Sequence, residues 1–173
     1  LAHIREVHAI VEVVRAFRNE NITHVERSVD PIRDIDIIAT ELALKDLESK
    51  EKENLLANKK RIYLINGEAG DVSDALKQKI TAEGASYIVV NLTNNPDVSH
   101  VAQEAYRILN LISFFTTGED ETRAWTITRG SKAPQAAGVI HTDFEQRFIR
   151  AEVVAYNQLL EAGGWIQARS RGW

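Results

Sequence analysis

Hydrophobic and polar positions follow two different periods through the first two thirds of the chain. Three short runs are rich in β-branched and aliphatic residues, as buried strands are, and they cover residues 9–17, 61–66 and 86–92. Two longer segments between them carry apolar residues at helical spacing. The order strand, helix, strand, helix, strand predicts a parallel sheet with crossover helices, and therefore an α/β fold.

Capping residues mark the ends of the predicted helices. Asp30 is a capping carboxylate and Pro31 stands at the first helical position, so a helix is predicted to begin here and to run to about Lys52. A second helix is expected over 71–84, with an Asp or Ser at its start and a glycine at its end. A third is expected over 97–109, after a break at Asn-Asn-Pro. The first helix is predicted to bury one face, formed by Ile35, Ile38, Leu42 and Leu47.

The pattern changes after Phe115 to short strands and turns, with Thr117-Gly118 as the predicted entrance. Residues 123–153 join an amphipathic strand to a Gly-Ser turn, a short helix opened by Pro134, and a second strand. We predict two domains, covering residues 1–111 and 112–173. The core of the second is predicted to contain Trp125, Ile127, Phe144, Phe148, Ile149 and Val153.

The amino-acid composition indicates the general class of protein but not any reaction that it catalyses. Apolar residues make up 44% of the 173 residues and charged residues 27%, as in soluble globular proteins. No apolar run approaches the roughly 18 residues that suggest a membrane span. There is no cysteine, so disulfides and thiolate metal sites are excluded and a reducing cytoplasm is the expected location. The net charge of −4 argues against a strongly basic nucleic-acid binder.

The order of residues in two segments indicates a protein family, which the composition does not. Residues 123–153 (RAWTITRGSKAPQAAGVIHTDFEQRFIRAEV) closely resemble the TGS domain of the YchF, or Obg-like, ATPases, a branch of the P-loop GTPase superfamily. Residues 1–49 resemble the stretch that follows the second phosphate-sensing loop in the same family. The resemblance covers most of 1–66 and 98–173 and is loose over 67–97. It implies a partial P-loop NTPase-type parallel sheet, followed by a small β-grasp (ubiquitin-like) TGS domain.

The resemblance implies a P-loop ATPase or GTPase that, in its complete form, hydrolyses ATP or GTP with Mg²⁺. It also implies association with the ribosome or RNA in the cytoplasm, and no membrane. The 173 residues contain no G-x-x-x-x-G-K-[ST] run, and the switch segments would lie before Leu1, so no catalytic residue is assigned. Most of a coiled-coil arm, near 50–54, and the last two TGS strands, after 162–173, are also expected to be missing. The alternatives are a non-catalytic fragment that binds RNA or ribosome through the TGS domain, and a regulatory lid without a ligand.

The resemblance places a base-recognition motif after the second predicted strand. GTP-specific relatives have Asn-Lys-x-Asp there, and the YchF branch has Asn-x-x-Glu, associated with a preference for ATP. Asn66 stands where that asparagine belongs, but the residue three positions later is Ala69, so Glu68 is considered as a displaced partner. The alternative is that Asn66 caps the strand end by bonding the backbone. The last base-contacting loop would be 91–93, although Asn91 and Leu92 depart from the family's small residues.

The C-terminal region offers candidates for RNA or partner binding. Four basic residues could present phosphate-binding groups, or could serve solvation alone: Arg129, Lys132, Arg147 and Arg150. Trp125 is either a stacking platform for bases or, as is usual for an alternating strand aromatic, a packing residue. His141 and Asp143 have a spacing that metal sites use, yet no third ligand is evident. Hydrogen bonds to backbone or to Glu145 are therefore expected instead, and no metal site is assigned.

Overall fold

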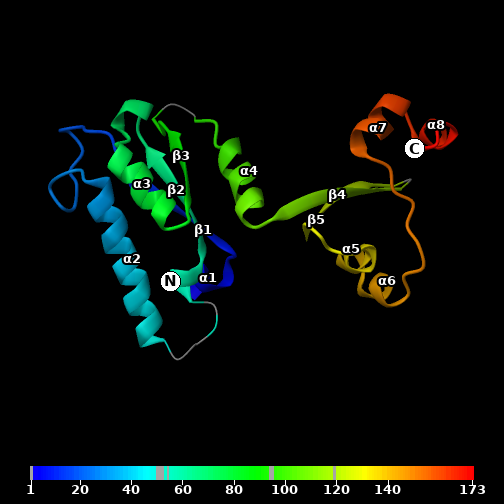
Figure 1. The fold of residues 1–173 in the computed structure, drawn as a ribbon, viewed down its shortest axis with the longest axis horizontal. Coiled ribbons are helices and arrows are strands. Elements are labelled where there is room, and N and C mark those ends of the chain that lie inside the picture. The colour runs from blue at the N-terminus through cyan, green and yellow to red at the C-terminus, as the bar shows by residue number, and fades with distance from the viewer. Residues whose placement is uncertain (1, 50–52, 54, 94–95, 119) are drawn as a thin grey trace. The chain divides into compact units, whose positions relative to one another are not determined.

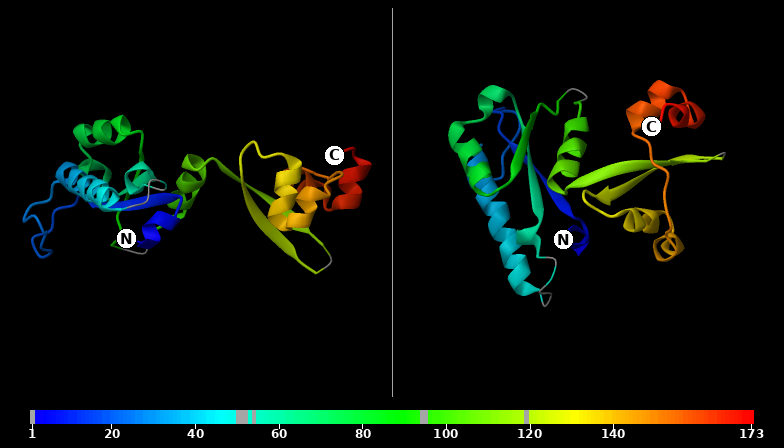
Figure 2. Two further views of the ribbon diagram at one scale, coloured as in Figure 1. Left: turned by 90° about the horizontal axis from the view of Figure 1, so that it is seen from below. Right: turned by 45° about the vertical axis from the view of Figure 1, so that its right-hand side comes forward.

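The computed structural model describes residues 2–49, 53, 55–93, 96–118 and 120–173. It divides into two compact units, Leu1–Ile112 and Ser113–Trp173, which are described separately (Figure 1). Figure 2 shows the same two units in further views. Among the described residues, no helix is long and apolar enough to span a membrane.

The first unit is built on three parallel strands in the order β1-β2-β3. The strands are β1 (Ala9–Arg15), β2 (Lys60–Asn66) and β3 (Ser86–Val90). The central strand β2 has four successive buried residues, 62–65, because both of its edges are bonded and both of its faces are covered. The predicted order, direction and approximate bounds of the strands are therefore confirmed.

Helices alternate with these strands, as predicted. The unit contains α1 (Ala2–Glu6), α2 (Pro31–Glu48), α3 (Asp74–Ala82) and α4 (Ser99–Ile108), with short 3-10 turns at η1 (Leu56–Asn58) and η2 (Ala69–Asp71). The Asp30 carboxylate accepts the Ile32 and Arg33 N–H groups, and Ser73 Oγ accepts the Leu76 N–H. The first helix ends at Glu48, with Ser49 as an extended C-cap whose N–H donates to the Asp46 carbonyl, so the end predicted near Lys52 is wrong. Asn94 and Asn95 of the predicted break lie outside the described residues.

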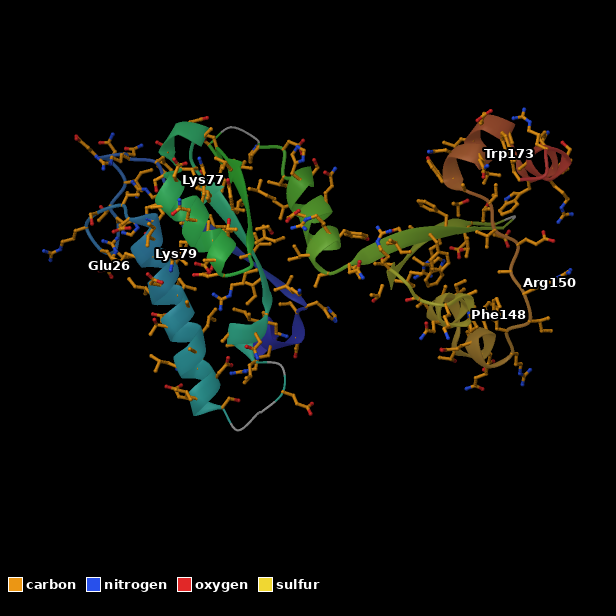
Figure 3. The ribbon with its side chains drawn as sticks, in the orientation of Figure 1. Glu26, Lys77, Lys79, Phe148, Arg150 and Trp173 are labelled. Atoms are coloured by element: carbon orange, nitrogen blue, oxygen red, sulfur yellow. The ribbon has the colours of Figure 1, made fainter. Side chains whose placement is uncertain are left out.

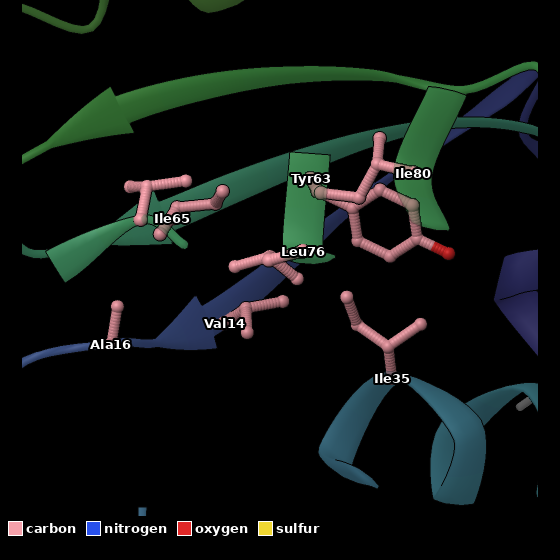
Figure 4. Packing of buried hydrophobic residues seen from close by; sticks show 8 residues of the cluster. Val14, Ala16, Ile35, Tyr63, Ile65, Leu76 and Ile80 are labelled. Carbon is pink, nitrogen blue, oxygen red and sulfur yellow. The ribbon is translucent and has the colours of Figure 1, made fainter. Parts of the chain in front are cut away.

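The core lies between the sheet and helices α2 and α3 (Figure 4). It consists of Val14, Ala16, Ile35, Tyr63, Ile65, Val72, Leu76 and Ile80. Each large side chain buried there contributes about 1.5–3 kcal/mol to folding. The buried face predicted for α2 is only half right, because Ile35 and Leu42 are buried whereas Ile38 is 39% and Leu47 83% exposed. The helix has 18 residues against nine in α3, so its second half extends past its covering partner.

The described part of the second unit contains one hairpin and four short helices. Strands β4 (Leu111–Thr117) and β5 (Thr122–Thr128) form a two-stranded sheet, and the Gly118 N–H donates to the Glu121 carbonyl across the turn. The helices are α5 (Ala133–Ile140), α6 (Thr142–Gln146), α7 (Tyr156–Ala162) and α8 (Trp165–Ser170). The predicted strand, Gly-Ser turn and Pro134-led helix within 123–140 are confirmed.

The second strand predicted near the end of 123–153 is not formed, because residues 147–155 have no helical or strand structure. A strand is stable only where its backbone groups find the edge of another strand. In the described part of this unit the sheet is a single hairpin, and it adds no third strand. Three residues predicted for the core are accordingly exposed, Phe144 by 53%, Ile149 by 92% and Val153 by 82%. Trp125, Ile127 and Phe148 are half-buried.

Candidate base-binding site

The candidate site lies where the three parallel strands end. The chain leaves β1 after Arg15, β2 after Asn66 and β3 after Val90, and Asn66 is the register partner of both other residues. All three loops therefore begin at one edge of the sheet. Open parallel sheets bind ligands in the crevice outside the carboxyl ends of their strands. This edge of the sheet is therefore the candidate ligand-binding site of the first unit.

Asn66 ties the three strand ends together. Its backbone carbonyl accepts the Ala16 N–H at 2.9 Å and the Phe17 N–H at 3.4 Å, beyond β1. Its side-chain Oδ1 accepts the Leu92 N–H at 3.1 Å, beyond β3. The bond to the backbone is the one expected from the capping alternative. It uses the oxygen of the carboxamide, and among the described residues the Nδ2 group has no partner.

Glu68 and Asn91 meet across the same edge. Asn91 Nδ2 donates to Glu68 Oε1 at 2.7 Å, and both side chains are exposed. The Glu68 N–H donates to Asp71 Oδ2 at 2.9 Å, and the Asp71 N–H donates back to the Glu68 carbonyl at 2.9 Å. Glu68 is thus held at its backbone by the η2 turn and at its carboxylate by the loop after β3.

Gly67 allows the two loops to approach. Its N–H donates to the Val90 carbonyl at 3.2 Å, which extends the pairing of β2 and β3 by one step. A Cβ atom at this buried position would lie 2.9 Å from Asp71 Oδ2 and 3.3 Å from Ala16 Cβ. Any other residue would therefore push against the turn that carries Glu68.

The loop after β1 is ordered by two side chains that the sequence reasoning did not single out. The Arg15 guanidinium donates to the carbonyls of Phe17, Asn19 and Ile22 at 3.1–3.2 Å. His24 accepts the Glu26 N–H through Nδ1 at 3.2 Å, and its Nε2 lies 3.0 Å from Asp34 Oδ2. With both ring nitrogens bonded, His24 pins the loop to the first turn of α2.

Glu12 was also missed, although a charged residue within the apolar run AIVEVV was the available signal. It stands opposite Tyr63 in the register of β1 and β2. Its Oε2 atom is buried without a hydrogen-bond partner in the described part of the chain. Burial raises the pKa of Glu12 to about 7; nearby Arg61 opposes this rise and Glu83 adds to it.

The four basic candidates of the second unit are exposed and share one property. Among the described residues, none of the side chains of Arg129, Lys132, Arg147 and Arg150 has an ion-pair or hydrogen-bond partner. Figure 3 shows Arg150 on the extended segment after α6. The other three basic residues of this unit are engaged. The Arg123 guanidinium lies 4.2 Å from the centroid of the Trp125 ring, Arg169 pairs with Glu152, and Arg171 pairs with Glu161 at 3.8 Å.

Trp125 and His141 have structural partners. The Trp125 Nε1–H donates to Thr116 Oγ1 at 2.9 Å while Arg123 covers its ring, which favours packing over base stacking. His141 Nδ1 accepts the Asp143 N–H at 3.2 Å at the start of α6, so the expected backbone hydrogen bond is confirmed. The described residues contain no group of three or more His, Cys, Asp or Glu side chains that could hold a metal ion.

A parallel α/β sheet with polar loops at its carboxyl edge is the architecture of nucleotide-binding α/β proteins. Comparison with known proteins is more specific. The YchF-GTPase_C family, described as a protein of unknown function (DUF933), matches residues 111–173. The ribosome-binding ATPase YchF of Bacillus subtilis is 32% identical over 253 residues, covering 99% of this chain and 69% of the relative. Human Obg-like ATPase 1 is 31% identical, covering 99% of this chain and 65% of its own length.

A solved structure agrees. The Schizosaccharomyces pombe YchF GTPase superposes with a TM-score of 0.75 at 30% identity, covering 99% of this chain and 68% of the other. The chain belongs to the YchF (Obg-like ATPase) family. The alignment with the Bacillus relative extends over more residues than the 173 of this chain, so the relative has internal segments without a counterpart here. The predicted position of the missing arm stays a prediction, since residues 50–52 and 54 lie outside the described residues.

Proposed function

We propose that the first unit carries the base-reading part of a nucleotide site, and that the complete protein is a ribosome-associated ATPase that also accepts GTP. The observation that carries this proposal is the convergence of Asn66, Glu68 and Asn91 at the carboxyl edge of the sheet. The names of the relatives called ribosome-binding ATPase YchF support ATP hydrolysis as the reaction and the ribosome as the partner. Association with ribosomes would place the protein in the cytoplasm.

The residues at this edge fit a purine base. Asn66 Nδ2 is a donor that suits a ring nitrogen of the base, while its Oδ1 stays on the Leu92 N–H. Glu68 is an acceptor that suits an exocyclic amine. When bound, Mg²⁺ would supply charge neutralisation at the phosphates during phosphoryl transfer. The residues named here would do a different task, which is to select the base and hold it against the sheet edge.

Isothermal titration of the chain with adenosine tests the base site. The variant Asn66→Asp keeps an oxygen for the Leu92 N–H and removes the Nδ2 donor. We expect it to weaken adenosine binding about tenfold, the effect of losing one hydrogen bond to a charged or well-placed partner. Asn157→Ala, an exposed asparagine of α7, is the matched control and should leave binding unchanged. Unaltered adenosine affinity in Asn66→Asp would contradict the assignment of Asn66.

A second candidate function rests on the second unit. We propose that Arg129, Lys132, Arg147 and Arg150 contact RNA phosphates, which would make this unit the ribosome-facing part. Arg169 and Arg171 are paired with carboxylates, whereas these four exposed cations have no partner among the described residues and are available to phosphates. Unpaired, exposed cations are the groups that release counterions on binding phosphates.

Salt-dependent binding of a ribosomal RNA fragment tests this second function. Changing Arg129 and Arg150 together to Gln should weaken binding and reduce the slope of log affinity against log salt by about 2, one for each phosphate contact. The matched control changes Arg169 and Arg171 to Gln and should leave the slope within experimental error. Equal losses in the two double variants would show only a general charge effect, and would contradict the assignment.

A further inference from the structure

Two side chains that depart from the family's base-binding pattern meet in this structure. The resemblance expects a glutamate three residues after Asn66, where this chain has Ala69, and a small residue where it has Asn91. The glutamate that is present, Glu68, stands one position early. Its carboxylate accepts the Asn91 amide across 23 residues of sequence. The two departures are therefore parts of one contact.

The orientation of Asn91 is set by its own loop. The Thr93 N–H donates to Asn91 Oδ1 at 3.0 Å, which identifies the oxygen end of the carboxamide. The Nδ2 end is thereby directed to Glu68 Oε1. The loop itself is fixed to β2 by the Gly67 N–H to Val90 carbonyl bond and the Leu92 N–H to Asn66 Oδ1 bond. Asn91 is thus pre-oriented toward the carboxylate before any ligand binds.

We propose that Asn91 is a specificity-determining residue, which holds the Glu68 carboxylate so that only Oε2 is fully free for the base and adenine is favoured over guanine. This inference rests on the proposed base-binding function. It makes Glu68, rather than a residue three positions after Asn66, the acidic group that reads the base in this chain.

The preference follows from the donors that each base presents. Guanine offers two adjacent donors, N1–H and the N2 amine, which engage both oxygens of a free carboxylate. Adenine offers a single amine, at N6, beside an acceptor ring nitrogen. The Asn91 amide occupies one lone pair of Oε1 and weakens bidentate acceptance of the guanine pair by Glu68, whereas Oε2 still accepts one amine. Asn91 therefore removes an advantage from guanine without a loss for adenine.

Titration of the 173-residue chain with adenosine and with guanosine tests the inference. The chain and five variants are compared: Asn91→Ala, Asn91→Ser, Glu68→Gln, the double variant of Asn91→Ala with Glu68→Gln, and Asn157→Ala as the matched control. In Asn91→Ala the ratio of adenosine to guanosine affinity should fall about fivefold or more, the lower range for one bidentate pair. In the Glu68→Gln background, the same Asn91 change should leave the ratio unaltered. Asn91→Ser keeps an oxygen for the Thr93 N–H and should repeat the effect of Asn91→Ala if alanine disturbs the loop.

The possible results distinguish a failure of the role of Asn91 from a failure of the proposed base site. An unchanged ratio in Asn91→Ala and Asn91→Ser, with adenosine still bound, would overturn the role of Asn91 and leave the base site standing. An equal change in the Glu68→Gln background would also overturn it, because the effect would then not pass through the carboxylate. Binding of neither nucleoside by the unaltered chain would overturn the proposed base site, and the inference with it.

Discussion

The two units of this protein use their apolar side chains in opposite ways. In the first unit a three-stranded parallel sheet and two helices enclose a core in which Ile35, Tyr63 and Ile80 are fully buried. In the second unit only two alanines, Ala162 and Ala168, are buried among the hydrophobic residues described, while large side chains such as Ile149 and Ile166 are exposed. The main contacts of the second unit join elements that are neighbours in the chain, such as β4 with β5 and α5 with α6. The core of the first unit requires strands that are far apart in the chain.

The contrast in packing indicates which unit can hold the side chains of a small-ligand site in place. A site needs side chains held by packing and by a second layer of hydrogen bonds. Asn66 and Glu68 have that support, because each is bonded to a neighbouring loop as well as anchored by its own strand or turn. The basic residues of the second unit act as exposed charges, which suits an extended phosphate surface better than a small ligand.

The largest expected effect compares the same substitution in the two units. Ile35→Ala removes a fully buried side chain and should lower the free energy of unfolding of the first unit by about 2–5 kcal/mol. Ile149→Ala, at a residue that is 92% exposed, should change stability by less than about 0.5 kcal/mol. Urea unfolding followed by far-ultraviolet circular dichroism measures both variants. All three tryptophans lie in the second unit, so their fluorescence reports that unit alone. Comparable losses in both variants would contradict the contrast.

A medium effect is expected at Gly67. Gly67→Ala would place a methyl group against Asp71 and Ala16, and the resulting overpacking should cost about 1–3 kcal/mol. It should also weaken adenosine binding, since the displaced turn carries Glu68. The control is Gly70→Ala, where the added Cβ meets nothing within 4 Å. Thermal unfolding and titration of the two variants provide the comparison, and equal behaviour of both would refute the close approach at Gly67.

The smallest effect concerns pH and Glu12. The pKa of Glu12 is raised to about 7 in the folded protein, above the ordinary value of 4.5, so the folded state holds a proton that the unfolded state releases. The stability contributed by this group is complete below about pH 4.5 and is lost as the pH rises to about 7. Because the side chain is only partly buried, we expect the loss to be about 1 kcal/mol after screening by solvent.

Glu12→Gln checks this pH dependence. The variant should be more stable than the unaltered chain at pH 8 and nearly equal to it at pH 4, as measured by urea unfolding at each pH. Glu41→Gln, at an exposed position of α2, should show no such difference between the two pH values. A parallel pH profile for the unaltered chain and Glu12→Gln would show that the buried oxygen does not control stability.

Much of the first unit follows from signals that act over short distances. Asp30 and Pro31 begin a helix because a carboxylate accepts the free N–H groups and proline needs no donor there. Runs of aliphatic residues form strands because a parallel sheet buries both faces. The second strand predicted within 123–153 is not formed, because its own pattern cannot supply the edge of a neighbouring strand. Ile149 and Val153 are exposed as a result.

The candidate site could be predicted only in part. The placement of Asn66 at a strand end was visible from the run that precedes it, together with the family resemblance. The contact between Glu68 and Asn91 was not visible, because it depends on the register of β2 and β3 and on the turn at Asp71. The unpaired oxygen of Glu12 likewise depends on which face of β1 is covered.

The most direct test of the proposed base site is a map of adenosine binding by ¹H–¹⁵N correlation spectroscopy of the 173-residue chain. A base site at the carboxyl edge predicts that the amide signals of Gly67, Glu68, Leu92 and Thr93 shift in a saturable manner, together with the side-chain amides of Asn66 and Asn91. Shifts confined to the second unit, or to the opposite end of the sheet near Lys60 and Ser86, would contradict the assignment of the base site to the carboxyl edge.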